Sequence, residues 1–281
     1  MILEQYNKVS YGISKKLTNA YSTSFSLGIK AFSSEFRDPI YGIYGFVRIA
    51  DEIVDTFHNT DKKHLLKKFR EDTHEAIELG ISTNPVLHSF QEVARKYKIE
   101  KELIESFLNS MEMDLSEVSY ERDDYDNYIY GSAEVVGLMC LRVFTRGNEA
   151  EYQTLKEPAR QLGAAFQKVN FLRDIQSDLE ERGRIYLPGV HEEVKISDSN
   201  KKQLELEVEK EFDDALVGIK QLPIGVKLGV YSAYMYYRVL FNKIKKLSVD
   251  QLLAKRVRVP NRIKFLLLLK SIVEVKVLKV T

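Results

Sequence analysis

The chain has 281 residues, of which 44% are hydrophobic and 30% are charged. A chain of this length can bury one large core or two small ones, and its charge keeps it in solution. Its net charge of +1 excludes a general attraction to nucleic acid, so no nucleic-acid partner is expected. The single cysteine, Cys140, excludes an internal disulfide and is typical of a protein in a reducing cytoplasm.

The N-terminal part of the chain is predicted to be helical. One helix runs from about Leu3 to Ala20, and a shorter one follows over residues 21–32. A third helix begins in the segment 33–37, has Pro39 in its first turns and ends near Asp55. Three further amphipathic helices are expected over residues 61–79, 84–97 (with Asn84 as N-cap) and 100–116.

The third helix has a polar side and an apolar side. Its polar or aromatic stripe consists of Tyr41, Tyr44, Arg48, Asp51 and Asp55. Its opposite, apolar side consists of Ile43, Phe46, Ala50, Ile53 and Val54. The aspartates of this stripe stand one turn apart, four positions from each other.

The middle of the chain contains an acidic segment and then a glycine-containing helix. Residues 121–126 lack the glycine and the spaced glutamate of a calcium loop, so we interpret them as a helix-capping turn. In the next helix, one face carries Tyr130, Glu134, Gly137 and Leu141. Gly131 and Gly137 remove side chains there, which leaves room either for a neighbouring helix or for an apolar ligand.

A second polar stripe lies on a helix expected over residues 148–179. Asn170, Asp174 and Asp178 stand at successive i+4 positions, with Gln167 one turn earlier, so they fall within a sector of roughly 80°. Phe166 and Phe171 border the stripe, and the far side is apolar. Polar residues with apolar borders are typical of a helix that lines a polar cavity inside a protein.

The two stripes together suggest a metal site. Carboxylates stacked one turn apart repel each other, and a divalent cation removes that cost. Mg²⁺ takes one or two carboxylates, keeps some waters and completes its shell with phosphate oxygens. With Arg48 and Arg173 beside them, the stripes suit a diphosphate bound through bridging Mg²⁺. The alternative is a charged helix face whose spacing has no metal function.

The C-terminal part is also mainly helical. Residues 188–200 are expected to form a loop, followed by helices over 203–221 and 224–247. The basic segment 255–260 contains Arg256 and Arg258, which lie either on the surface or over a bound phosphate. The valine-rich tail, residues 272–280, fits a strand as well as a helix.

Nothing in the sequence divides the chain into separate units. It has no internal repeat, low-complexity tract or flexible linker. No signal peptide is expected, and the longest apolar run, residues 265–269, is far shorter than the roughly 20 residues of a membrane span. We therefore predict an all-α fold in which residues 1–281 form a single domain around a central cavity.

Four segments carry a resemblance to a known family. They are Tyr21-Ser-Thr-Ser-Phe25; Arg48 with Asp51-xxx-Asp55; Tyr130-Gly-Ser-Ala-Glu-Val-Val-Gly137; and Gln167-xx-Asn170-xx-Arg173-Asp174-xxx-Asp178 followed by Arg184-Ile-Tyr-Leu-Pro188. Together they resemble the squalene/phytoene synthase family, over residues from about 22 to 262. Departures are modest: Tyr21 stands where the family often has His, and Gln176-Ser177 replaces the more usual Gly-Glu.

The resemblance implies an isoprenoid-synthase-type helical bundle and assigns roles to individual residues. The implied catalytic residues are Asp51, Asp55, Asp174, Asp178 and Tyr130. The implied metal ligands are Asp51, Asp55, Asn170, Asp174 and Asp178. The implied substrate-binding residues are Ser22, Ser24, Tyr44, Arg48, Gln167, Arg173, Tyr236 and Arg256.

The resemblance also implies a reaction. Family members join two allylic diphosphates head to head through a cyclopropylcarbinyl diphosphate. The expected substrate is geranylgeranyl diphosphate and the expected product is phytoene, a carotenoid precursor, with Mg²⁺ (Mn²⁺ as alternative) and without NADPH. The alternatives are dehydrosqualene or squalene formation from farnesyl diphosphate, a hydroxysqualene-forming relative, and a non-catalytic assembly factor, which would be expected to lose aspartates from the stripes.

A final expectation concerns membranes. The segment 255–279 is rich in basic side chains and contains the apolar run 265–269. It either docks peripherally on anionic lipid or consists of basic helices packed on the domain. We expect a cytoplasmic location, with peripheral contact at the inner face of the cell membrane as the hypothesis to test. The sequence does not indicate an oligomeric state.

Overall fold

The computed structural model describes residues 2–116, 120–182, 184, 186, 188 and 197–277. Every regular element in these ranges is helical, which confirms the predicted all-α fold. The N-terminal elements are α1 (Ile2–Tyr21), α2 (Thr23–Lys30), α3 (Ser34–Asp55), α4 (Lys62–Leu79) and α5 (Pro85–Tyr97). These bounds agree closely with the predicted ones. The Asn84 side chain accepts hydrogen bonds from the N–H groups of Val86 and Leu87, as expected of an N-cap.

The middle elements differ from the prediction at one point. They are α6 (Lys101–Met113), α7 (Arg122–Ile129), the π-helical turn η1 (Tyr130–Glu134) and α8 (Val135–Phe144). The acidic segment 121–126, predicted as a turn, is instead the start of α7, and Glu121 stands at its N-cap position. Asp123 and Asp124 lie in the first turn, where carboxylates complement the helix dipole, so the acidic residues favour the helix.

The C-terminal elements correct one further prediction and decide one that was left open. They are α9 (Glu149–Arg182), α10 (Asp198–Gln221), α11 (Ile224–Ile244), α12 (Val249–Ala254), α13 (Asn261–Ile272) and η2 (Val273–Val277). The predicted loop 188–200 extends too far toward the C-terminus, because α10 already begins at Asp198. Ser197 caps this helix by accepting a hydrogen bond from the Asn200 N–H. The rest of that loop, residues 189–196, lies outside the described residues. The valine-rich tail is helical as far as Val277, and residues 278–281 are not described.

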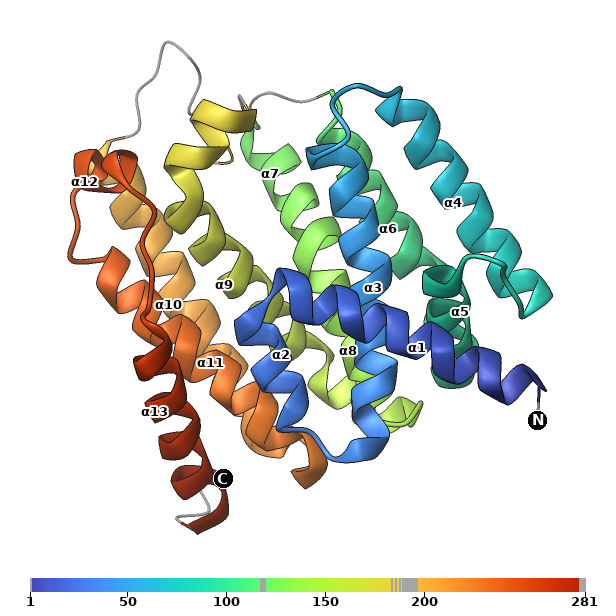
Figure 1. Ribbon diagram of the computed structural model, residues 1–281. Helices are drawn as coiled ribbons and strands as arrows, with labels where there is room; N and C mark the ends of the chain where they lie inside the picture. Colours follow the sequence, from blue (N-terminus) through green and yellow to red (C-terminus); the bar gives the residue numbers. More distant parts are fainter. Residues whose placement is uncertain are drawn as a thin grey trace.

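The helices form one bundle in which α3 and α9 run in the same direction (Figure 1). Their C-terminal ends, where the two acidic stripes lie, are both at the top of the view. α1 packs on α3 and α5, α10 packs on α9, and α13 packs on α11 at the lower left of the view. The close approach of α1 to α3 depends on Gly45, because a Cβ there would lie 2.6 Å from Ser14 Oγ.

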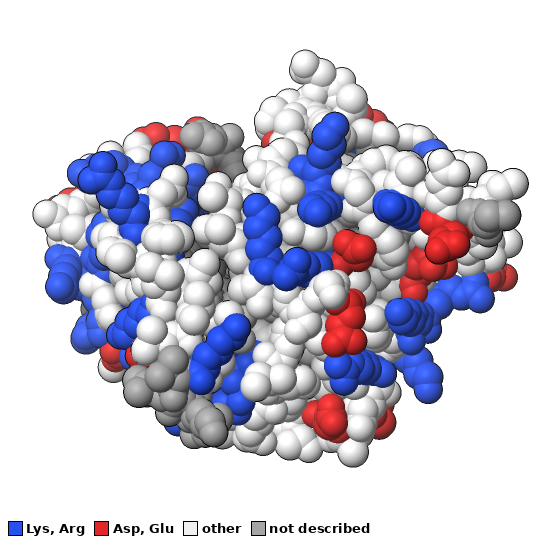
Figure 2. Space-filling view, turned by 60° about the horizontal axis from the view of Figure 1, so that its bottom comes forward, with Lys and Arg blue, Asp and Glu red and all other residues white. Residues whose placement is uncertain are grey.

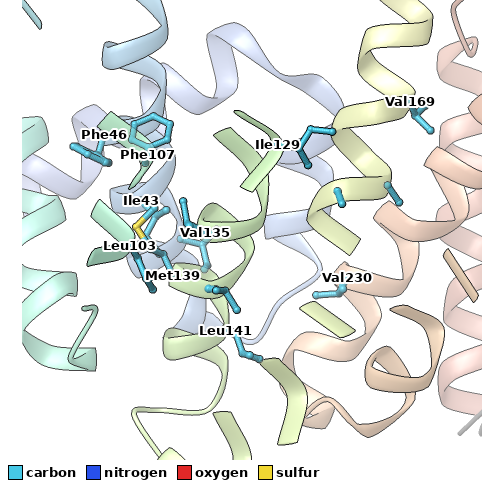
Figure 3. Packing of buried hydrophobic residues seen from close by; sticks show 14 of the residues in the cluster. Ile43, Phe46, Leu103, Phe107, Ile129, Val135, Met139, Leu141, Val169 and Val230 are labelled. Carbon is cyan, nitrogen blue, oxygen red and sulfur yellow. The ribbon is translucent and has the colours of Figure 1, made fainter. Parts of the chain in front are cut away.

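The hydrophobic core is continuous from Ile29 to Val275 in one cluster of contacting side chains. Figure 3 shows Val135 and Met139 of α8 beside Ile43 of α3 and Leu103 of α6. This cluster gives α3 and α8 a rigid apolar back, so the polar side of α3 faces the other way. No helix within the described ranges combines the length and the apolar character needed to cross a bilayer.

Candidate functional site

A cavity of about 600 Å³ lies among α2, α3, α8, α9, α10, α11 and α13. Its lining changes character along α9. The first part of this helix contributes Leu155, Pro158, Ala159 and Leu162, and the later part contributes Gln167, Asn170 and Arg173. The cavity therefore has an apolar end and a polar end. It lies within the size range of small-molecule sites in proteins.

The apolar end is lined by aromatic and aliphatic side chains. Phe32 and Phe144 lie edge to face with ring centroids 5.3 Å apart, and both line the cavity. Ile29, Leu155 and Leu222 complete this part of the wall. A lining of this kind excludes water and has the chemistry to accept a hydrocarbon chain.

The polar end has a hydrogen-bonded chain of side chains on α9. The Tyr237 hydroxyl donates to Asn170 Oδ1 (3.1 Å), Asn170 Nδ2 donates to Gln167 Oε1 (3.4 Å), and Gln167 Nε2 donates to Ser132 Oγ (3.3 Å). The Tyr237 ring also stacks on Phe166, with centroids 3.9 Å apart. These contacts fix the orientation of the polar stripe relative to α11 and η1.

Asp174 lies beyond Arg173 on α9 and is bound by two arginines. Arg173 Nε donates to Asp174 Oδ1 (2.9 Å), and Arg256 Nε donates to the same oxygen (2.6 Å). Burial alone would raise the pKa of Asp174, but the two guanidinium groups outweigh it and hold the pKa below its ordinary value. Asp174 is therefore an anion at neutral pH.

The stripe on α3 is arranged more openly. The Arg48 guanidinium pairs with Glu52, lies 4.0 Å from Asp51, and stands over the Tyr21 ring at 4.1 Å from its centroid. Arg48 lines the polar end of the cavity, whereas Asp51 and Asp55 lie in the turns beyond it. The α3 and α9 stripes thus repeat one plan, in which an arginine faces the cavity and the carboxylates follow.

Arg184 joins the two stripes at their C-terminal ends. Its backbone N–H donates to the Asp178 carbonyl oxygen (2.9 Å), and its Nη1 donates to Asp55 Oδ1 (2.9 Å). The same guanidinium lies 3.4 Å from the buried Asp114. Arg184 therefore sets the spacing between the ends of α3 and α9.

Asp114 is part of a buried network that the sequence reasoning missed. It accepts hydrogen bonds from the hydroxyls of Tyr128 (2.9 Å) and Tyr186 (2.8 Å). Burial raises the pKa of Asp114 to about 6, although Arg184 and the two tyrosines act in the opposite direction. The available signal was Tyr186 within the Arg-Ile-Tyr-Leu-Pro segment, but nothing in the sequence paired it with an aspartate so far away in the chain.

The donor set at this end of the cavity fits a divalent cation in its chemistry. The predicted ligands, Asp51, Asp55, Asn170, Asp174 and Asp178, offer only carboxylate and amide oxygens, which Mg²⁺ prefers. In the arrangement described, however, no group of three or more His, Cys, Asp or Glu side chains could hold a metal ion among the described residues. Arginines neutralise Asp174 and Asp55 instead, so these carboxylates would have to exchange partners to bind a cation.

All of the predicted substrate-binding residues come together in space. The cavity is lined by Ser22, Ser24, Tyr44, Arg48, Gln167, Arg173, Tyr236 and Arg256, together with Asn170. Ser22 is positioned by its second role as the N-cap of α2, where its Oγ accepts a hydrogen bond from the Phe25 N–H (3.1 Å). Tyr130 is not among the lining residues; the Arg160 guanidinium stands over its ring, 5.4 Å from the centroid. A catalytic role for Tyr130 stays a prediction.

The two glycines whose purpose the sequence left open have different environments. A Cβ on Gly131 would lie 2.5 Å from the Ser106 carbonyl oxygen, so this glycine serves helix packing against α6. A Cβ on Gly137 would lie 3.1 Å from the Ala159 carbonyl oxygen, and Gly137 also lines the cavity. Gly137 therefore serves both the α8–α9 contact and the cavity wall.

Lys264 of α13 is a further cation at the cavity that the sequence reasoning missed. It lines the cavity, and its ammonium group lies 5.3 Å from the centroid of the Tyr236 ring. Burial and the neighbouring Arg173 lower its pKa. Its i+4 spacing to Leu268, which also lines the cavity, was a usable signal, because it places both on one helix face. Arg48, Arg173, Arg256 and Lys264 thus surround the polar end.

Solved structures share this fold. A dehydrosqualene synthase bound to a ligand superposes with a TM-score of 0.84, at 22% identity, and the match covers 97% of this chain and 98% of that one. A squalene synthase from Alicyclobacillus acidocaldarius gives a TM-score of 0.75 at 19% identity, covering 85% of this chain and 94% of that one. At these identities the likeness concerns the fold, and it matches the predicted isoprenoid-synthase-type helical bundle.

Curated relatives are phytoene synthases. The chain is 27% identical over 268 residues to phytoene synthase of Arthrospira platensis, covering 86% of this chain and 85% of the relative. It is 28% identical over 247 residues to 15-cis-phytoene synthase of Enterobacter agglomerans, covering 79% and 82%. It is 26% identical to the chloroplastic phytoene synthase 1 of Arabidopsis thaliana, covering 80% of this chain but only 57% of the length of that protein. The model of the family described as squalene/phytoene synthase matches residues 18–262, and this chain therefore belongs to that family.

Proposed function

We propose that this protein is a phytoene synthase that condenses two molecules of geranylgeranyl diphosphate head to head. In the proposed reaction the first diphosphate leaves, an allylic cation forms, and the double bond of the second substrate attacks it. Ring closure with loss of a proton, which the released diphosphate can accept, gives a cyclopropylcarbinyl diphosphate. This intermediate loses its own diphosphate, rearranges and loses a second proton to give phytoene, a carotenoid precursor. The observation that carries the proposal is the cavity whose lining changes along α9 from apolar residues to a polar end surrounded by cations.

The polar end has the groups that a departing diphosphate requires. A leaving diphosphate develops dense negative charge, and preorganised cations stabilise such charge most effectively where water is excluded. Arg48, Arg173 and Arg256 supply three guanidinium groups there, with Lys264 as a fourth cation. Bound Mg²⁺ would add Lewis-acid stabilisation of the leaving group. The carboxylates of Asp51, Asp55, Asp174 and Asp178, with Asn170, are the residues that would hold it.

The apolar end has the groups that an allylic cation requires. Such a cation reacts with water, so it must be enclosed by groups that cannot act as nucleophiles. Phe32, Phe144, Leu155 and Leu162 enclose this part of the cavity. Tyr44 and Tyr236 present aromatic rings near the polar end, and ring faces attract cations. Burial raises the pKa of Tyr44 to about 12, so its hydroxyl stays neutral and does not deprotonate to a nucleophile.

A second candidate reaction uses farnesyl diphosphate and gives a C30 product. The Phe32–Phe144 pair in the apolar lining favours it, because two bulky rings there reduce the space for a longer chain. The dehydrosqualene synthase and squalene synthase among the structural neighbours also support it. C20 substrates remain our first proposal, because Ile29 and Gly137 leave more room than aromatic side chains would.

The test is incubation of the purified protein with Mg²⁺ and an equimolar mixture of geranylgeranyl and farnesyl diphosphate, followed by mass separation of the hydrocarbons. We expect mainly a C40 product, formed without NADPH. Exclusive formation of C30 products would transfer the assignment to the second candidate. Failure to consume either diphosphate, by a protein that is folded by circular dichroism, would favour a non-catalytic role.

A further inference from the structure

Helix α13 and the first residue of η2 expose a continuous apolar stripe on their outer face. Phe265, Leu266, Leu269 and Val273 are 58%, 61%, 44% and 47% exposed. Their spacing places them on one side of the helix, opposite the buried Leu267 and Ser271. Single exposed apolar residues are ordinary, but four neighbouring ones on one helix face mark an interaction surface.

Basic side chains accompany the stripe. Arg262, Lys270 and Lys276 are exposed at its beginning, middle and end. The acidic residue of this segment, Glu274, is engaged, because it accepts a hydrogen bond from the Tyr231 hydroxyl (3.0 Å) and lies 3.7 Å from Lys270. In Figure 2 the left part of the face, on the side where α11 and α13 lie in Figure 1, carries many Lys and Arg and few Asp and Glu.

The inner face of the same helix borders the cavity. Lys264 and Leu268 line it, and the exposed Phe265 and Leu269 each follow one of them directly in the chain. α13 is therefore a wall with the cavity on one side and the apolar stripe on the other. Anything that binds the stripe lies one helix diameter, about 10 Å, from the cavity.

We propose that the outer face of α13 docks the protein on an anionic lipid surface, with Phe265, Leu266, Leu269 and Val273 inserted at the boundary between headgroups and acyl chains. An apolar stripe flanked by basic side chains is the pattern of helices that lie in the plane of a membrane interface. Anionic lipid headgroups match the basic flanks in charge. A second copy of the chain matches them poorly, because a two-fold interface through this stripe would bring basic residues against each other. If the proposed function holds, docking would also place the cavity next to a lipid phase that can receive a hydrocarbon product.

The test is flotation of the full-length protein with vesicles, without substrate. The vesicles contain phosphatidylcholine alone or phosphatidylcholine with phosphatidylglycerol, at low and at high salt. We expect flotation with the anionic vesicles at low salt, weaker flotation at high salt, and little with neutral vesicles. Because turnover is not measured, the result is independent of the proposed reaction.

Two matched variants make the test specific. Leu266→Glu should weaken binding to anionic vesicles about 10-fold or more, because it removes an inserted leucine and adds a repelled charge. Leu79→Glu, at a leucine of 63% exposure on α4 at the other side of the molecule, changes charge equally and should leave binding unchanged. Absence of binding to anionic vesicles, or equal binding by both variants, would overturn the proposal. A concentration-dependent dimer that Leu266→Glu abolishes would identify the stripe as an interface between copies instead.

Discussion

Helix α9 has two charged faces, and only one of them borders the cavity. On the cavity face, Arg173 and Asp174 stand at the polar end, with Arg256 reaching Asp174 from the segment before α13. On the face toward α10, the buried Lys168 ammonium donates to Glu207 Oε2 (3.0 Å) and to Glu211. Both faces hold ionic groups away from water. The pKa of Asp174 is lowered on the cavity face, and the pKa of Glu211 is raised on the α10 face.

The two faces differ in what satisfies their charges. On the α10 face, Lys168, Glu207 and Glu211 pair with one another inside a packed helix–helix interface, and none of them lines the cavity described above. On the cavity face, four cations line the cavity and no carboxylate of the described residues does, so an anion can still enter. A cluster of buried charges is therefore not in itself a site. Open space beside unbalanced charge is what identifies one.

Removing a carboxylate from the cavity side should have the largest effect on activity. Asp174→Ala or Asp51→Ala is expected to lower turnover at saturating Mg²⁺ by about 10³-fold, since each removes a proposed metal ligand worth several kcal/mol to the transition state. Steady-state assay of diphosphate release measures this. Asp213→Ala, which removes an exposed carboxylate 3.6 Å from Arg238, is the control and should stay close to wild type. Near-normal turnover by either cavity-side variant would show that the metal site is misassigned.

The apolar end of the cavity should govern chain length. Ile29→Phe adds volume to the wall near Phe32 and is expected to lower use of geranylgeranyl diphosphate relative to farnesyl diphosphate by about 10- to 100-fold, because the longer chain clashes. Competition between the two diphosphates measures the ratio. Ile104→Phe, at a buried isoleucine that does not line the cavity, controls for overpacking alone. Ile29 is a better test site than Gly137, where any side chain would press on the α9 backbone.

Local periodicity predicted the helices, and it also grouped Arg48 on α3 and Gln167 and Asn170 on α9 on sides that line the cavity. Asp51 and Asp174 stand where i+4 spacing puts them, beyond Arg48 and Arg173 on the same helix sides. Contacts between segments far apart in the chain could not be predicted from local periodicity. The pairing of Asp174 with Arg256 and the burial of Asp114 against Tyr186 join segments far apart in the chain. The acidic start of α7 was misinterpreted because the same residues serve as a cap signal and as favourable first-turn residues.

Lys264 should matter for substrate binding more than for chemistry. Lys264→Met keeps most of the side-chain volume but removes the cation over the Tyr236 ring, and is expected to raise KM about 10-fold with a smaller change in kcat. Lys246→Met removes one charge from an exposed position on the segment after α11 and should change neither constant. An unchanged KM for Lys264→Met, assayed without vesicles, would mean that this ammonium group does not contact the diphosphate.

The α10 face of α9 should affect stability alone, in a pH-dependent way. Burial raises the pKa of Glu211 to about 7 against the influence of Lys168, and its Oε2 atom has no hydrogen-bond partner among the described residues. Because the folded-state pKa is raised, the stability that this group contributes is present below pH 4.5 and is lost as pH rises through 7. Glu211→Gln cannot ionise. The unfolding free energy of wild type should therefore fall relative to that of the variant by roughly 2 kcal/mol between pH 5 and pH 8, as measured by urea denaturation.

Turnover of the variant at pH 7 should stay within about twofold of wild type, because no charge at the cavity has changed. A stability difference that is constant or grows with pH would show that Lys168 stabilises the carboxylate more than burial opposes it. A large loss of turnover would show that the two charged faces of α9 are coupled.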